Sequence, residues 1–172
     1  AMIRKIHLAN ALNKQDWETI REDLNKRPVE GENGETEEGV ILQLLLEYGI
    51  TANTVALWGT GKPLREFLWS EEMADACVYI MEHVDFKDLA KDTDEVRNCH
   101  INIGTGKEIS IKELAGLIAK TVGYNGEIIF NADKPDGAMR KLTDPSKLHS
   151  LGWRHRIDIE EGVRKLYDWY KE

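Results

Sequence analysis

Residues 55–81, VALWGTGKPLREFLWSEEMADACVYIM, decide the fold that the sequence predicts. Val55–Trp58 is a short apolar run closed by Gly59, so it is expected to be a strand, and a second strand is expected over Arg65–Trp69. Ser70 is placed to cap a helix, with acidic residues following at its positive end. Helical spacing predicts an inner face made of Met73, Cys77, Ile80 and Met81. Short strands that alternate with helices indicate an α/β or α+β arrangement.

Toward the N-terminus the pattern is helical and then changes character. Ala1–Leu12 carries apolar residues at helical spacing and is expected to be a helix already in progress, with no strand before it. A polar helix is expected over Gln15–Lys26, an acidic, glycine-punctuated mobile loop over Glu30–Glu38, and an apolar helix over Val40–Tyr48. Asn13–Thr51 therefore differs in character from the sequence that follows it.

Toward the C-terminus, strands and helices alternate again. Strands are expected over His100–Ile103 and Glu127–Phe130. Ser110–Glu113 has the pattern of a capping box that opens a helix. Further helices are expected after the Asp144–Pro145 pair and from Asp158. The strands are too few and too short for a doubly wound sheet, so the sequence predicts a mostly helical accessory lobe that packs on a neighbour.

The composition narrows the class of protein. The chain has 172 residues, of which 41% are hydrophobic and 31% charged, as in a single soluble globular domain. The net charge of −8 argues against nucleic acid and anionic membranes as partners, because the mean field repels phosphate. No apolar run approaches the roughly 20 residues of a membrane span, and a cytoplasmic location is expected.

The cysteines and histidines give no sign of a metal site. Cys77 and Cys99 are the only cysteines, and we expect both to be buried free thiols in a reducing compartment. The five histidines do not cluster with them, whereas a zinc site needs four ligands close together. No metal is therefore expected.

Two glycine-rich segments are candidates for ligand-binding loops. In Trp58–Arg65 the glycines allow a close backbone approach, Arg65 suits a diphosphate, and Trp58 offers a flat apolar face to a sugar or base. The alternative is a hairpin with a core tryptophan and a surface arginine. The second segment, Gly104–Lys107, lacks the spacing of a phosphate-binding loop and is interpreted as a turn before a helix.

A third segment, Lys134–Leu142, places an aspartate beside two cations. Pro135 and Gly137 form a turn that presents Asp136, next to Arg140 and Lys141. Such a group suits a base or ribose donor together with phosphate, and the alternative is a solvated turn. The Tyr-x-x-x-Lys match at Tyr167–Lys171 falls at the end of the last helix and is interpreted as coincidence, so no catalytic residue is predicted.

Together these segments resemble the extended short-chain dehydrogenase/reductase family. Runs at 59–68 and 102–114 are shared by many nucleotide-sugar epimerases and dehydratases. The run Lys-Pro-Asp-Gly-x-x-Arg-Lys-Leu at 134–142, followed by Leu-Gly-Trp at 151–153, is similar to GDP-L-fucose synthases in particular. The resemblance covers residues 1–12 and 54–172 and skips residues 13–53, which it therefore implies to be an insertion. It implies the C-terminal substrate-binding lobe of such an enzyme, without its dinucleotide-binding Rossmann half.

The resemblance implies an enzyme that epimerises GDP-4-keto-6-deoxy-D-mannose at C3 and C5 and then reduces C4 with NADPH. In that family the cofactor loop and the catalytic residues precede the stretch present here, so this chain alone is expected to bind neither NADP nor a metal and to be inactive. The expected partners are the GDP-sugar and the Rossmann half, and the parent is expected to be a homodimer. The substrate contacts implied by the family motif are Lys5, Trp58, Arg65, Asp136 and Lys141.

Two alternatives remain open from the sequence. One is the substrate lobe of another nucleotide-sugar epimerase or dehydratase acting on UDP or dTDP sugars. The other is a stand-alone nucleotide-binding module with no enzyme parent. Preference for the base separates the first alternative from a GDP-L-fucose synthase.

Overall fold

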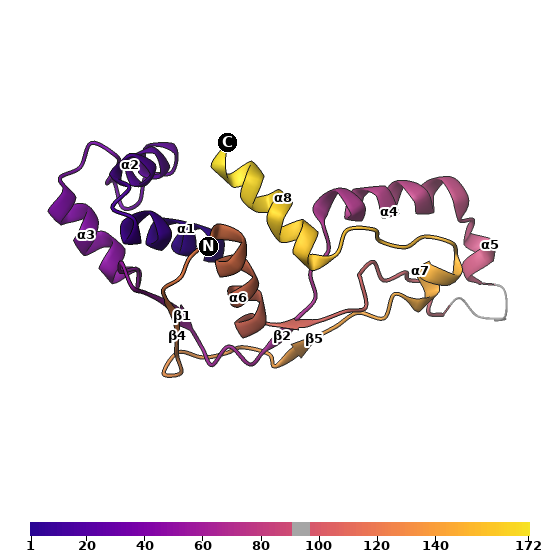
Figure 1. Cartoon of the computed structure of the whole chain (residues 1–172). Coiled ribbons are helices and arrows are strands. Elements are labelled where there is room, and N and C mark those ends of the chain that lie inside the picture. Colours follow the sequence, from indigo (N-terminus) through magenta and orange to yellow (C-terminus); the bar gives the residue numbers. More distant parts are fainter. Residues whose placement is uncertain (91–96) are drawn as a thin grey trace. The chain divides into compact units, whose positions relative to one another are not determined.

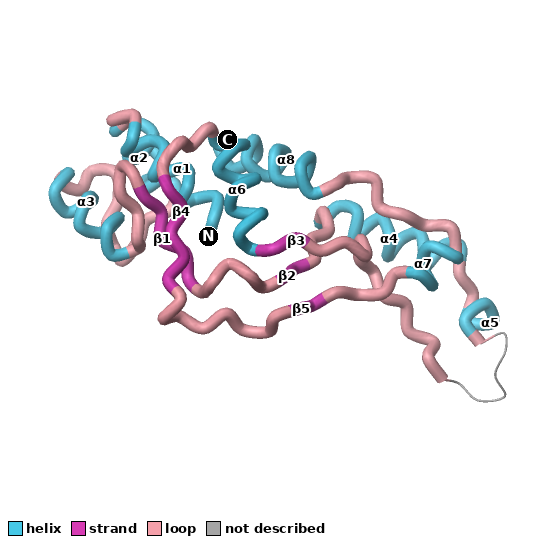
Figure 2. Tube along the Cα trace, turned by 60° about the horizontal axis from the view of Figure 1, so that its bottom comes forward, coloured by secondary structure: helices cyan, strands magenta, loops and turns pink. Residues whose placement is uncertain are grey.

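The computed structural model describes residues 1–90 and 97–172, which form helices joined by short strands (Figures 1 and 2). The helices are α1 (Met2–Asn13), α2 (Trp17–Lys26), α3 (Glu38–Glu47), α4 (Ser70–His83), α5 (Phe86–Leu89), α6 (Ile111–Val122), α7 (Ser146–Ser150) and α8 (Ile159–Lys171). The strands are β1 (Thr54–Trp58), β2 (Leu64–Arg65), β3 (Ile109–Ser110), β4 (Glu127–Asn131) and β5 (Arg140–Lys141). The predicted class, mostly helical with few short strands, is confirmed.

The chain divides into two compact units. Unit 1 consists of Ala1–Pro63, Ser110–Met139 and Leu166–Glu172, and unit 2 consists of Leu64–Ile109 and Arg140–Lys165. β1 and β4 pair in parallel in unit 1, and the second sheet has the strand order β3–β2–β5.

The centre of unit 1 is aliphatic. α1 packs against α2, α6 and β1. Ile6 of α1, Ile20 of α2 and Val55 of β1 are completely buried, and Leu24 is 1% exposed. Helical spacing puts such residues on one face of each helix, so burying that face holds the unit together.

The segment 13–53 is part of this core and is tied to it by a buried carboxylate. Asp23 accepts a hydrogen bond from Arg4 Nε at 2.7 Å, lies 3.5 Å from an Arg27 nitrogen, and accepts a hydrogen bond from the Tyr170 hydroxyl. Burial and the hydrogen bond to Asp23 raise the pKa of Tyr170. α1, α2 and α8 are therefore linked through one side chain.

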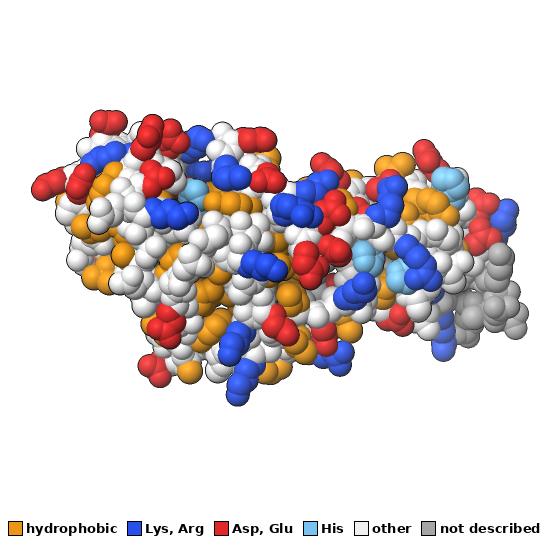
Figure 3. All heavy atoms as spheres, in the orientation of Figure 1, with side chains coloured by type: hydrophobic (Ala, Val, Ile, Leu, Met, Phe, Trp, Pro, Cys, Tyr) orange, Lys and Arg blue, Asp and Glu red, His pale blue; other side chains and the backbone are white. Residues whose placement is uncertain are grey.

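The acidic loop between α2 and α3 is held by hydrogen bonds. Arg21 donates to the carbonyl oxygens of Gly34 and, at 3.0 Å, Thr36, whose hydroxyl donates to Glu32 at 2.8 Å. On the face drawn in Figure 3, acidic side chains gather over α2 and this loop. A loop is present here as predicted but ends at Glu37, because α3 begins at Glu38, and its backbone has defined partners.

Unit 2 has a smaller core, built on Ala76 of α4, Leu148 of α7 and Trp153, and the predicted inner face of α4 is largely wrong. Ala76 is completely buried, whereas Met73 is 42% and Met81 76% exposed, and Cys77 is exposed; only Ile80 packs against the core. Glu72 is 5% exposed because its carboxylate accepts the backbone N–H groups of residues 156 and 157. The buried face of α4 therefore contains Glu72 and Ala76 in place of the stripe that periodicity favours.

Three other predictions in unit 2 are corrected. His100–Ile103 is irregular, because Ile101 and Ile103 pack singly on the Trp153 cluster and no strand forms there. The second predicted strand is limited to Leu64–Arg65. Ser70 is the first helical residue and makes no capping bond, with Trp69 at the cap position.

The helix ends elsewhere follow the sequence more closely. The capping box of α6 is present, with Ser110 accepting from the Glu113 N–H at 3.1 Å and Glu113 accepting from the Ser110 N–H at 3.0 Å. Gly123 ends α6 in the left-handed conformation. Asp144 accepts from the Ser146 N–H at 2.9 Å, so α7 begins one residue later than predicted.

The cysteines are free thiols, as predicted, but neither is buried: Cys77 is exposed and Cys99 half-buried. Burial was the wrong part of that prediction, because Cys77 lies on the outward side of α4. Among the described helices, none has the length and apolar character needed to cross a membrane.

Candidate functional site

The predicted diphosphate residue and one predicted partner lie side by side in unit 2. β2 pairs with β5 in parallel, and the register places Arg65 opposite Lys141. Residues that pair across two strands project from the same face of a sheet, so the two cations lie together. Arg65 is half-buried and donates to the Leu64 carbonyl oxygen at 2.7 Å, while Lys141 is exposed.

The neighbouring cation, Arg140, is already neutralised. Its Nε donates to Glu108 Oε2 at 2.8 Å, and this contact raises the pKa of the Arg140 guanidinium. Across the described residues, neither Arg65 nor Lys141 forms an ion pair with a carboxylate. Of these three cations, Arg65 and Lys141 are therefore the two whose charge is not paired with a carboxylate among the described residues.

Glu66, which follows Arg65 directly, organises the surrounding loops. One carboxylate oxygen accepts the N–H groups of Thr105 and Gly106, each at 2.6 Å, and the other accepts the Thr143 N–H at 3.0 Å and its hydroxyl at 2.6 Å. Burial alone would raise the pKa of Glu66, but these hydrogen bonds outweigh it and hold the pKa below the ordinary value. Gly104–Lys107 is thus the turn that the sequence predicts.

In unit 1, Trp58 forms an exposed aromatic shelf. It is the last residue of β1, and 71% of its surface is accessible. Lys134 Nζ lies 5.3 Å from the centroid of its ring. The hairpin alternative with a core tryptophan is therefore wrong for this residue, and an indole left open in this way can take a flat apolar face of a ligand.

Asp136 holds the glycine turn that follows Trp58. Its carboxylate accepts the Thr60 N–H and the Thr60 hydroxyl, each at 2.6 Å. A Cβ atom on Gly59 would lie 2.2 Å from Asp136 Oδ1, and Gly59 has a φ of +83°, so only glycine fits. Asp136 thereby joins the loop after β4 to the turn after β1.

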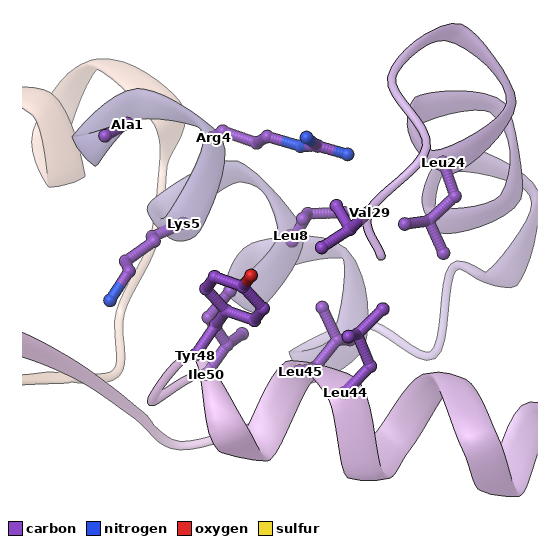
Figure 4. Close-up of a pocket in the computed structure, with 10 residues that line it drawn as sticks. All are labelled: Ala1, Arg4, Lys5, Leu8, Leu24, Val29, Leu44, Leu45, Tyr48 and Ile50. Carbon is purple, nitrogen blue, oxygen red and sulfur yellow. The ribbon is translucent and has the colours of Figure 1, made fainter. Parts of the chain in front are cut away.

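Lys5 lies on α1 at the edge of an apolar cavity in unit 1. Its Nζ donates to the Ala56 carbonyl oxygen at 3.1 Å, and burial lowers the pKa of its ammonium group. The cavity has a volume of about 180 Å³, and the aliphatic side chains around it come from α1, α2 and α3 and from Val29 and Ile50 (Figure 4). Arg4 also lines the cavity, but it forms an ion pair with Asp23. Of the two cationic side chains in the lining, Lys5 is therefore the one that is available to a ligand.

The structure adds residues that the sequence analysis missed. Glu66, Thr143, Thr60 and Lys134 all hold or flank the predicted residues. Two features of the sequence could have indicated them: the acid next to Arg65 and the threonine between two glycines. Acidic and threonine side chains often form hydrogen bonds with backbone N–H groups in tight turns.

No catalytic group emerges from the described residues. Tyr167 is 9% exposed, its hydroxyl lies 3.1 Å from His7 Nδ1, and the Lys171 ammonium lies near the face of its ring, so this pair serves packing. Within residues 1–90 and 97–172, no three potential metal ligands cluster.

The comparisons define the class of protein. Residues 25–104 match the NAD dependent epimerase/dehydratase family. The GDP-L-fucose synthase of Escherichia coli K12 is 45% identical over 121 residues, which is 70% of this chain and 37% of that protein. The chain is similar to members of this epimerase/dehydratase family, and the predicted resemblance to GDP-L-fucose synthases is confirmed.

Solved structures extend the likeness to nearly the whole chain. A GDP-6-OMe-4-keto-L-xylo-heptose reductase from Campylobacter jejuni superposes with a TM-score of 0.86 at 43% identity, covering 99% of this chain and 46% of that one. A GDP-mannoheptose C4 reductase from the same organism, solved with NADP bound, has a TM-score of 0.82 at 39% identity, covering 100% of this chain and 46% of that one. The chain thus spans less than half the length of these relatives.

Proposed function

We propose that this chain is the GDP-sugar-binding part of an NADP-dependent enzyme of the GDP-L-fucose synthase type. The observation that carries the proposal is the cross-strand pairing of Arg65 with Lys141, beside an Arg140 that Glu108 neutralises. Two cations fixed on neighbouring strands suit a diphosphate, which a guanidinium can bind through two parallel hydrogen bonds. The relatives' names supply the guanosine nucleotide.

Separate roles are proposed for each predicted residue. In unit 2, Arg65 and Lys141 bind the diphosphate. In unit 1, Trp58 offers its ring to a flat part of the substrate, Lys5 supplies a further cation, and Asp136 serves the nucleotide end. The carboxylate of Asp136 also bonds Thr60, so it contributes through the shape of the turn as well.

Catalysis is assigned to parts of a longer protein. Hydride transfer requires NADP next to the ketone, and epimerisation requires an acid and a base on opposite faces of the sugar. The chain on its own is expected to bind a GDP-sugar without converting it. Remote binding of this kind still contributes to rate, because it fixes the reacting ring relative to the cofactor.

A GDP-heptose reductase is the second candidate. The heptose enzymes match 99–100% of this chain, including residues 13–53, whereas the GDP-L-fucose synthases match 66–70% of it in sequence. Both candidates share the GDP moiety. Titration with GDP-L-fucose and with a GDP-heptose separates them, because the better substrate analogue binds more tightly.

The test is calorimetric titration with GDP, with UDP and dTDP as controls for the base. We expect clear preference for GDP, and Arg65→Ala to weaken binding by roughly ten- to a hundredfold, from a charge-assisted contact worth about 1.5–3 kcal/mol. Arg156→Ala is the matched control, since it removes the same charge from a side chain that is 80% exposed. Equal affinity of Arg65→Ala and the parent chain for GDP would remove Arg65 from the site.

A further inference from the structure

Glu66 receives an unusual number of hydrogen bonds for a side chain next to an anion-binding arginine. Its two oxygens accept five, from three residues on two separate segments: Thr105 N and Oγ1 and Gly106 N on one side, Thr143 N and Oγ1 on the other. Four of these bonds are between 2.6 and 3.0 Å long. Both segments belong to unit 2, as does Glu66.

The surrounding backbone fits only an ionised carboxylate. All five partners donate, and a glutamine in the same place could accept through one atom only, because its amide nitrogen carries hydrogens. The backbone at Gly104 also lies too close to Glu66 for any residue other than glycine at that position. A Cβ on Gly104 would lie 2.6 Å from Glu66 Oε1 and 2.1 Å from Thr143 Oγ1. The site therefore depends on the charge of Glu66 as well as its shape.

The pairing that this network supports is very short. β2 and β5 pair through only two residue pairs, Leu64 with Arg140 and Arg65 with Lys141. Strands in proteins are usually about five to six residues long, so a ladder of two pairs holds its register weakly by itself. Outside contacts have to fix which residue stands opposite Arg65.

Those contacts come from acids at both ends of the ladder. Glu108 holds Arg140 at the start of β5, and Glu66 holds Thr143 just beyond its end. Glu66 itself directly follows Arg65, so its bonds to Thr143 connect the end of β2 to the chain just after Lys141. Among the described residues Glu66 forms no ion pair with Arg65, and its oxygens face the loop donors instead.

We propose that Glu66 is a positioning residue that sets the spacing between Arg65 and Lys141 for the diphosphate of a nucleotide sugar. The proposal rests on the proposed function of that cation pair. Glu66 does not touch the substrate. It acts through the register of β2 and β5, and removing its charge while keeping its shape should misplace the two cations.

The experiment is a double-mutant cycle read by calorimetric titration with GDP. We expect Glu66→Gln to weaken binding roughly tenfold, and to change affinity less than about twofold once Arg65 is alanine, because residues that act through one another are not additive. Glu72→Gln is the control, because Glu72 is another acid of unit 2 whose carboxylate accepts backbone N–H groups from a distant segment, and the affinity of this variant for GDP should stay that of the parent. Parent-like affinity in Glu66→Gln, or a full additional loss in the Arg65→Ala background, would overturn the proposal.

Two further measurements keep the result decisive. If Glu66→Gln does not fold, Thr143→Val removes one hydroxyl donor to Glu66 with little change in shape, and it should weaken GDP binding about threefold; no change in affinity would count against Glu66. If the parent chain does not bind GDP at all, the proposed function fails for this chain. The positioning role is then decided by NMR without ligand: the Arg65 Nε–H and Lys141 amide signals should move in Glu66→Gln but not in Glu72→Gln, and unmoved signals reject it.

Discussion

Unit 1 places aliphatic side chains at its centre, whereas unit 2 uses acidic side chains to hold irregular backbone. Ile6, Ile20 and Val55 are completely buried in unit 1, and its buried acid, Asp23, bonds the side chains of other helices. In unit 2, Glu66 and Glu72 accept backbone N–H groups from loops. Helices satisfy their own backbone, but loops need outside partners when they pack closely.

The difference concerns function as well as stability. The proposed diphosphate residues lie on the two-residue strands of unit 2, next to the loops that Glu66 holds. The aromatic shelf in unit 1 instead ends a five-residue strand backed by a hydrophobic core. We therefore expect substrate binding by unit 2 to depend on charge, and the stability of unit 1 to depend on packing.

The largest expected effect comes from opening a cavity in unit 1. Ile6→Ala removes a completely buried side chain and should lower the free energy of unfolding by roughly 2–5 kcal/mol. Leu42→Ala, at a position that is 42% exposed, is the control and should cost less than about 1 kcal/mol. Urea titrations followed by the indole NMR signals of Trp17 and Trp153 report the two units separately. An equal loss of unfolding free energy at both indoles would show that the two units unfold together. The contrast between a packed unit 1 and a hydrogen-bonded unit 2 would then be wrong.

A smaller effect is expected from neutralising the buried acid of unit 2. Glu72→Gln leaves at least one backbone N–H of residues 156 and 157 poorly paired, which should cost about 1–3 kcal/mol. The exposed Glu82 lies on the same helix, and Glu82→Gln should change stability by less than about 0.5 kcal/mol. The Trp153 indole measures both. Matching urea midpoints for the two variants would mean that Glu72 does not hold this loop.

The smallest effect is a pH dependence carried by Glu66. Its pKa is lowered in the folded chain, so its stabilising contribution is complete above the ordinary value of 4.5 and is lost as the pH falls through the lowered pKa. The parent should therefore be more stable than Glu66→Gln at neutral pH, and the two stabilities should converge in acid. Urea midpoints of unit 2 between pH 7 and pH 3 test this. A constant difference across that range would show that the charge of Glu66 is not what stabilises the loops.

Local sequence signals were sufficient for most helices. The capping box at Ser110 and the helical spacing in α1 and α2 specify their elements through contacts within a few residues, and the structure confirms them. β1 and β4 were also predictable, because an apolar run bounded by turn residues has few other solutions. The comparisons confirm the family resemblance that was predicted from short motifs.

Distant partners decided the rest. The buried residues of α4 are Glu72 and Ala76, and Glu72 is paired with backbone N–H groups of residues 156 and 157, which lie far along the chain. Likewise, Arg65 and Lys141 were each recognisable from a motif, but their pairing depends on a two-residue ladder fixed by Glu66 and Thr143. Sequence by itself predicted which residues of this protein would bind a nucleotide sugar. Tertiary structure alone decided which of them stand together, because hydrogen bonds between remote segments leave no periodic trace in the chain.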